Sequence, residues 1–167
     1  MRKRRSLTSD DLMYSEAGSA LIEFSVSAGI VLALTFGILD ASRAMFADHF
    51  VATAARSATR YAMVRGSTWS GVSCASTATY ECAATEGDVT RFVRGELPLG
   101  LTPENLTAST TWLNTNPAGL PCDVTNGTNS PGCVVKVRVN YRFNFVLPFL
   151  PIDTLTLAST SALAVTR

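Results

Sequence analysis

The chain has 167 residues, of which 47% are hydrophobic and 16% are charged, and its formal net charge is +1. A charge so close to zero gives no bulk electrostatic case for binding nucleic acid, and the length allows one domain plus a membrane segment. The basic residues Arg2, Lys3, Arg4 and Arg5 are concentrated at the start. From Ser19 onward, basic and acidic residues balance. This composition suits a membrane-anchored or densely packed protein better than a soluble cytosolic enzyme.

An apolar run follows the basic N-terminal segment. Residues 24–39 carry no formal charge. As a helix, residues 19–39 would be about 31 Å long, close to the thickness of the hydrocarbon layer of a bilayer. We therefore predict a basic cytoplasmic leader at residues 1–18 and a transmembrane helix at residues 19–39. Because a basic flank stays in the cytoplasm, the rest of the chain should cross the membrane.

Glu23 lies near the start of this apolar run. A carboxylate in hydrocarbon costs at least about 2.5 kcal/mol, so such a residue usually has a function and a partner. A plain signal anchor does not explain it. A secretory signal cleaved near Arg43 is a second interpretation, although the charges of Asp40 and Arg43 crowd that site. In the third interpretation, Gly18 and Glu23 resemble the processing site of type IV pilin-like proteins. In those proteins a prepilin peptidase cuts after the glycine.

Cleavage after Gly18 would create a new amine on Ser19. Glu23 would then lie four residues along the helix, one turn away and on the same face. The amine of the same chain, or of a neighbouring chain in a filament, could neutralise the carboxylate. Removing one member of such a pair would strand the other charge, at a cost of about 3–5 kcal/mol.

Residues 40–66 continue without proline and predict an amphipathic stalk helix that stops at Gly66. Large and small apolar side chains recur at steps of three or four, which is typical of one helical face. The residues on this predicted face are Phe46, Phe50, Ala54, Ser57, Tyr61 and Val64.

The strings LIEFSV, FGILDASRAMF and ATAARSATRYAMVRG resemble the TadE-like family of the tight adherence (Tad, or Flp) pilus system. The resemblance implies a pseudopilin or minor pilin that is cut by a prepilin peptidase and works with other pilin-like subunits and an inner-membrane assembly platform. It makes Gly18 the cleavage residue, Ser19 the new N-terminus and Glu23 the assembly glutamate. It also implies a single-pass protein of the bacterial inner membrane, with a periplasmic or extracellular C-terminal domain that can enter surface pili. The pattern residues are Ala54, Ala55, Arg56, Arg60, Tyr61 and Ala62.

Four cysteines, Cys74, Cys82, Cys122 and Cys133, all follow the apolar run. Their spacings do not match a zinc knuckle. In an exported domain two short-loop disulfides are expected. The preferred pairing is Cys74–Cys82 and Cys122–Cys133, one of three possible connectivities. We therefore predict that residues 67–167 form an exported α+β domain with disulfide-stapled loops.

Within this domain a short helix is predicted between a Thr85 cap and Pro98, with Asp88 completing a capping box. Strands are predicted at residues 106–112, 135–145 and 154–166. The second and third strands should form a hairpin, and the first strand should join it in one sheet. This sheet should pack on the amphipathic half of the long helix. The expected fold class is α+β and type IV pilin-like. The inward-facing residues of the middle strand should be Val135, Val137, Val139, Tyr141, Phe143 and Phe145; those of the last strand should be Leu155, Leu157, Leu163 and Val165.

The sequence offers no constellation for catalysis, cofactor binding or metal binding, so we do not expect an enzyme. His49 is the only histidine, and no nucleophile elbow or phosphate-binding loop is present. The basic stripe Lys136, Arg138 and Arg142 lacks interleaved aromatic residues, so a nucleic-acid partner is not expected. The leading hypothesis is a structural pilus-assembly protein. The alternative is a membrane-tethered extracytoplasmic adhesin or scaffold domain that never joins a filament.

Overall fold

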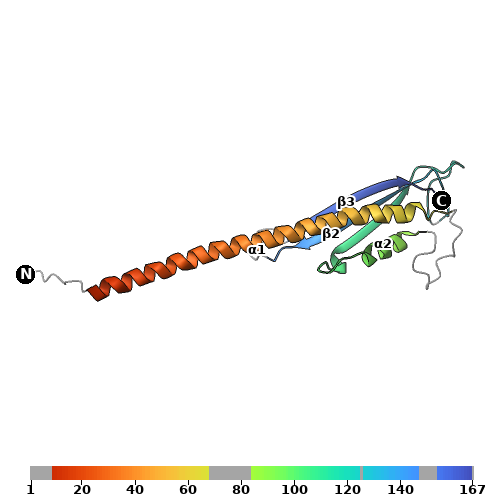
Figure 1. Ribbon diagram of the computed structural model, residues 1–167. Helices are drawn as coiled ribbons and strands as arrows, with labels where there is room; N and C mark the ends of the chain where they lie inside the picture. Colours follow the sequence, from red (N-terminus) through yellow and green to blue (C-terminus); the bar gives the residue numbers. More distant parts are fainter. Residues whose placement is uncertain (1–8, 68–83, 125, 147–153, 167) are drawn as a thin grey trace, which may run out of the picture. The chain divides into compact units, whose positions relative to one another are not determined.

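The computed structural model describes residues 9–67, 84–124, 126–146 and 154–166. Its fold class is α+β, as the sequence predicts, with a long N-terminal helix and a small antiparallel sheet (Figure 1). The chain divides into two units, residues 1–42 and 43–167, and α1 runs through both. The elements in chain order are α1 (Ser9–Met63), α2 (Glu86–Gly95), the 3-10 turn η1 (Pro103–Asn105), β1 (Leu106–Leu113), β2 (Val134–Asn144) and β3 (Thr154–Ala164).

Helix α1 differs from the prediction at both ends. It begins at Ser9, inside the segment expected to be only a leader, and it ends at Met63 rather than Gly66. The last carbonyl groups of a helix lack partners within it. Here the Met63 carbonyl accepts the N–H of Thr166 at 3.0 Å, and the Arg65 carbonyl accepts the N–H of Ala84 at 2.8 Å. These bonds to distant segments fix where the helix stops.

The three strands form one antiparallel sheet in the order β1-β2-β3. Leu106 of β1 pairs with Tyr141, and Phe143 pairs with Leu155 of β3. The alternation predicted for the central strand is confirmed. Val135, Val137 and Val139 are fully buried, whereas Lys136, Arg138 and Arg142 are exposed on the opposite face.

The buried face of α1 is not the one predicted. Phe46, on the predicted apolar face, is 51% exposed, and Phe50 on the same face is only partly buried. Small side chains take the inner positions because they let the helix backbone approach the sheet, where a phenylalanine would overfill a close-packed core. Ala54 and Tyr61 were predicted correctly. The buried face consists of Ala47, Val51, Ala54, Ala55, Ala58, Thr59, Tyr61 and Ala62.

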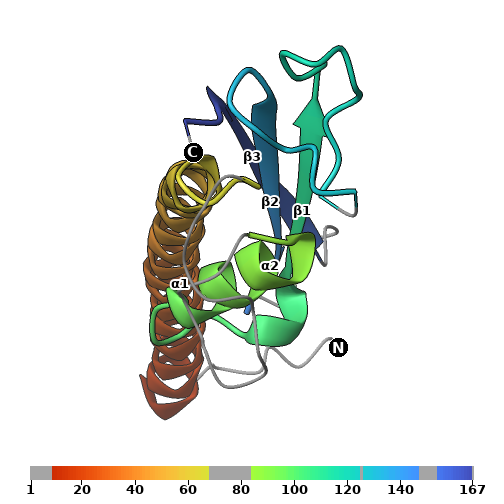
Figure 2. The ribbon, with the colours of Figure 1, turned by 90° about the vertical axis from the view of Figure 1, so that its right-hand side faces the viewer.

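Helix α2 forms as predicted, with a capping box at its start. The Thr85 hydroxyl accepts the N–H of Asp88 at 3.2 Å, and the Asp88 carboxylate accepts the N–H of Thr85 at 3.1 Å. Val89 and Val93 are fully buried and belong to the same core as α1 and the sheet. Figure 2, seen along α1, shows both helices beside the three strands, which they cover on one face.

Strand β3 is less buried than predicted. It ends at Ala164, and its inward residues Leu155 and Leu163 are 39% and 37% exposed. The reason is its position, because β3 is an edge strand with β2 as its one neighbour in the sheet. Val165 lies just beyond the strand and is buried, with its N–H bound to the Cys133 carbonyl at 2.8 Å.

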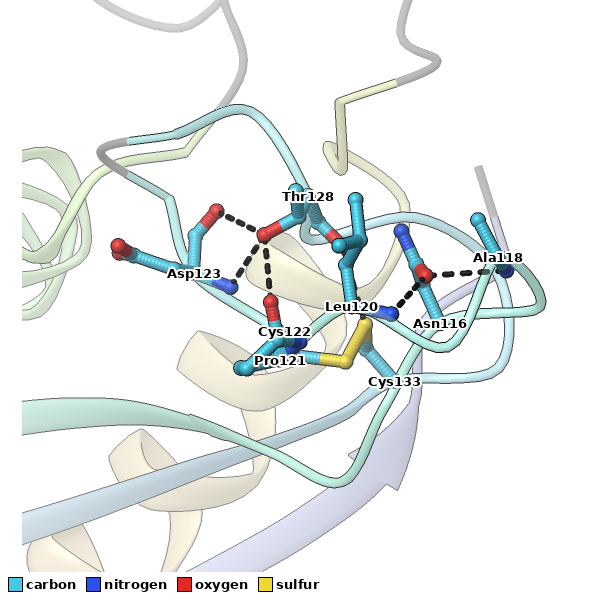
Figure 3. The surroundings of a disulfide bond; sticks show 8 residues. All are labelled: Asn116, Ala118, Leu120, Pro121, Cys122, Asp123, Thr128 and Cys133. Atoms are coloured by element: carbon cyan, nitrogen blue, oxygen red, sulfur yellow. Dashed lines mark hydrogen bonds between the residues drawn. A yellow bond between two sulfur atoms is a disulfide. The ribbon is translucent and has the colours of Figure 1, made fainter.

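The long connection between β1 and β2 is closed by a disulfide. Cys122 and Cys133 are bonded, as predicted, with a Cα–Cα distance of 5.8 Å (Figure 3). The Thr128 hydroxyl donates to the Pro121 carbonyl at 2.6 Å and accepts the N–H of Asp123 at 2.9 Å. The loop is thus ordered by its own side chains as well as by the sulfur bridge. The predicted pair Cys74–Cys82 lies outside the described residues.

Candidate functional site

The three residues predicted to direct processing and assembly lie within one uninterrupted stretch of α1. Gly18, Ser19 and Glu23 are all helical and exposed. Ser19 and Glu23 are four residues apart, so they share a face about one turn apart. A methyl group added to Gly18 would meet no atom within 4 Å. Substitution of this glycine by alanine therefore disturbs no side-chain packing among the described residues.

Glu23 is surrounded along the helix by exposed apolar side chains. Leu21, Ile22 and Phe24 are between 67% and 73% exposed. Within the described ranges, the Glu23 carboxylate has neither a hydrogen bond nor an ion pair. A bilayer around this stretch would leave the carboxylate in need of a cation from outside the described chain, or from an amine newly created at Ser19.

Three hydroxyl groups in and beside the apolar stretch donate to backbone carbonyl groups of the helix itself. The hydroxyl of Ser25 donates to the Ile22 carbonyl, that of Thr35 to the Val31 carbonyl, and that of Ser42 to the Ile38 carbonyl, each at 2.8 Å. Polar groups in hydrocarbon must find partners within the protein because water is absent there. These bonds make the helix compatible with a lipid environment.

The apolar stretch of α1 is left uncovered by the described chain. The most apolar 18-residue window has none of its residues buried. An ordinary core helix would instead hide this surface against its own domain. By length and composition, this helix could span a membrane, which is consistent with membrane anchoring.

The peptide bond after Gly18 lies inside a helix, because α1 begins at Ser9. The predicted boundary between a leader at residues 1–18 and a helix from residue 19 is therefore not a boundary of secondary structure. Access to that bond requires local opening of the helix. Glycine is about 1 kcal/mol less favourable than alanine in a helix interior. The helix at Gly18 is therefore less stable than it would be with alanine at this position, which makes local opening there easier.

The Ala-Ala-Arg pattern in the second half of α1 divides into packing and exposed residues. Ala54, Ala55 and Ala62 are buried, and the ring of Tyr61 is stacked on that of Phe92 with centroids 4.5 Å apart. By contrast, Arg56 and Arg60 are exposed. The pattern therefore joins α1 to α2 on one side and presents two guanidinium groups on the other.

Tyr61 has two aromatic and cationic partners that a helical period does not predict. Phe92 comes from α2, and the guanidinium of Arg65 lies 4.2 Å from the centroid of the Tyr61 ring. A helical period identifies which residues of one element share a face, but it does not indicate which second element covers them. His49 is exposed. No group of three or more metal-binding side chains comes together within the described ranges.

Together, these features define an α+β protein whose N-terminal helix could span a membrane and whose remaining described elements pack around the second half of that helix. Residues 18–60 match the family model described as TadE-like protein, so the chain is TadE-like over this segment. The match begins at Gly18 and includes Glu23, Arg56 and Arg60. It points to a Tad pilus-associated protein. Comparison with curated proteins and with solved structures gives no match.

Proposed function

We propose that this protein is a structural pseudopilin or minor pilin of a Tad (Flp) pilus. It is inserted in the bacterial inner membrane by residues 19–39, with its N-terminus in the cytoplasm and its C-terminal domain outside. A prepilin peptidase cuts after Gly18, and the processed chain joins other pilin-like subunits at an inner-membrane platform. It performs no catalysis.

One observation carries this proposal. Ser19 and Glu23 lie on one face of an exposed apolar helix, in a segment that matches the TadE-like family model. Cleavage would put a cation one turn from a carboxylate that has no partner among the described residues. Inside a bilayer or a packed bundle of helices, each charge is then tolerable only because the other is present, since a lone buried charge is strongly destabilising.

The surrounding helix supports this role in two ways. The hydroxyl groups of Ser25 and Thr35 bond to its own backbone, whereas the Glu23 carboxylate has no partner among the described residues. The helix is also continuous from the cleavage position to Met63, where it is integrated in the core of the folded domain. An interaction at the amine of Ser19 is therefore linked to the domain by one continuous helix.

The experiment is to determine the mass of the mature protein from its native host, with and without the peptidase gene. We expect a chain that starts at Ser19 in the first case and an intact leader in the second. Gly18→Val should block cleavage, whereas Gly29→Val, at another helical glycine where an added methyl group meets no atom, should not. An intact N-terminus in functional pili would refute the proposal and favour a static membrane-tethered adhesin or scaffold.

A further inference from the structure

The outer edge of β3 presents backbone groups that bond to no other described residue. The N–H of Val165 donates to the Cys133 carbonyl at 2.8 Å, one position beyond the register pair of Val134 and Ala164. In an antiparallel ladder, residues that bond to the neighbouring strand alternate with residues whose N–H and C=O groups point away from it. We call the residues of β3 that point away from β2 the β3 edge; they are exposed, and they are Thr156, Ala158, Thr160 and Ala162.

The two edges of the sheet differ in how they are protected. Natural sheet edges usually carry a lysine, a proline, a bulge or a covering helix, because an unprotected edge binds other strands. Residues 154–164 contain neither a charge nor a proline, and they pair with β2 in an unbroken register. At β1, the same alternation makes the Ala108 carbonyl point away from β2, and the Thr90 hydroxyl of α2 donates to it at 3.4 Å. A helix therefore flanks the edge of β1, whereas β3 has no such cover among the described residues.

A hollow on the inner side of the sheet adjoins the β3 edge. It is lined by Leu157 of β3 and by five residues of α1, which are Ala44, Met45, Asp48, His49 and Ala52. None of the described lining residues comes from β2, so the hollow lies on the outer side of β3. Figure 2 shows α1 on the β3 side of the sheet, where the Thr59 hydroxyl donates to the Ser161 carbonyl at 3.3 Å. The second half of α1 thus forms a floor at the place where a fourth strand would lie, and edge and floor both belong to the unit of residues 43–167.

We propose that an extended segment of another pilin-like subunit adds to the β3 edge as a fourth strand. Its backbone bonds to the β3 edge, and every second side chain enters the hollow. Those side chains are apolar, because Ala44, Ala52 and Leu157 offer them apolar surface. The added strand also covers Leu155 and Leu163, which are 39% and 37% exposed. Only the nature of the partner, a pilin-like subunit, rests on the proposed function; the strand-binding edge does not.

The space beside β3 suits a single strand better than the edge of a second copy. If two β3 edges paired, each domain would bring its own α1 under the shared edge, and packed helices need about 8–10 Å between their axes. The β1 edge of a second copy is flanked by Thr90 of α2. A chain end or a long loop has no helix beneath it, so it fits the space above α1.

The test measures binding of a fluorescein-labelled peptide with the sequence of residues 154–164 to the purified full chain in detergent, by fluorescence anisotropy. This peptide is an uncharged strand without a helix beneath it. Ala158→Pro removes an N–H from the β3 edge, and Ala108→Pro, the matched control, removes an outward N–H from the edge of β1. Proline is tolerated in edge strands where the N–H faces solvent. We expect Ala158→Pro to weaken peptide binding at least about tenfold, and Ala108→Pro to leave it unchanged.

Two results would overturn the strand site. One is the absence of peptide binding to the unsubstituted chain, and the other is equal binding to the two proline variants. Melting temperatures verify that the variants fold, and Ala162→Pro, at the same edge, replaces Ala158→Pro if that variant unfolds.

A second measurement in the native host tests the nature of the partner. Ala158→Pro should be cleaved after Gly18 but depleted from sheared pili at least about tenfold, whereas Ala108→Pro should be incorporated. Normal incorporation of Ala158→Pro would overturn a pilin-like subunit as the partner. Absence of the unsubstituted chain from pili would instead refute the proposed function, and peptide binding would still decide whether the β3 edge accepts a strand.

Discussion

The ring of Tyr61 in α1 stacks on the ring of Phe92 in α2, with centroids 4.5 Å apart and planes inclined by 17°. Tyr61 is 7% exposed and belongs to the Ala-Ala-Arg pattern on which the family resemblance rests. The stack joins two helices that are separate in the sequence. Part of that pattern therefore serves the fold of the domain rather than contact with another protein.

Tyr61→Ala should lower the free energy of unfolding by about 3 kcal/mol, because it removes a buried ring and the stacking of that ring on Phe92. Thermal denaturation of the detergent-solubilised protein, followed by circular dichroism, measures the change. Arg60→Ala, one residue away and exposed, is the matched control and should stay within about 0.5 kcal/mol of the original protein. Equal effects of the two substitutions would contradict the packing role of Tyr61.

The disulfide between Cys122 and Cys133 closes a loop with a sequence separation of 11. In the chain-entropy model a crosslink of this length stabilises the folded state by about 3 kcal/mol. The double substitution Cys122→Ala with Cys133→Ala should therefore lower the melting temperature measurably. Because Cys133 is fully buried, alanine keeps the site apolar. An unchanged melting temperature would mean that the loop is held without the bridge, by the bonds of Thr128 and by the Asn116 side-chain oxygen, which accepts the N–H groups of Ala118 and Leu120.

The capping box of α2 gives a smaller and more local prediction. Thr85→Ala removes the hydroxyl that accepts the N–H of Asp88, which should cost about 1 kcal/mol. Thr85→Ser keeps the hydroxyl and should be close to neutral. Urea denaturation of the two variants compares them directly. If serine is as destabilising as alanine, the methyl group of Thr85 and not its hydroxyl stabilises the helix.

Glu23→Ala should prevent incorporation into pili while leaving membrane insertion intact, because the amine of Ser19 then has no carboxylate. Loss of one partner in a buried pair costs about 3–5 kcal/mol, which corresponds to at least a hundredfold loss of incorporation. Immunoblotting of sheared pili and of membranes measures the two quantities. Asp48→Asn removes an exposed carboxylate of the same helix and should have little effect. Pili that form normally with Glu23→Ala would rule out the proposed role of Glu23.

The regular elements were predictable from local patterns. Strict alternation from Val135 to Phe143 defines a half-buried strand, and the capping box at Thr85 and Asp88 defines the start of α2, because each depends on residues a few positions apart. The inner face of α1 was not predictable in the same way. Phe46 and Ala47 both fit a helical period. Ala47 is the one that is buried, because the sheet lies close to the helix and leaves room for only a small side chain.

Three features were predictable from hydrophobicity and spacing along one chain segment. They are the membrane-compatible helix, the position of Glu23 one turn from Ser19, and the pairing of Cys122 with Cys133 as the preferred choice. Three others became known from the three-dimensional packing: the stacking of Tyr61 on Phe92, the half-exposed edge position of β3, and the position of Leu99 near Phe46. Each of those depends on how distant segments pack, and packing depends on shape and volume in three dimensions, which no local period encodes.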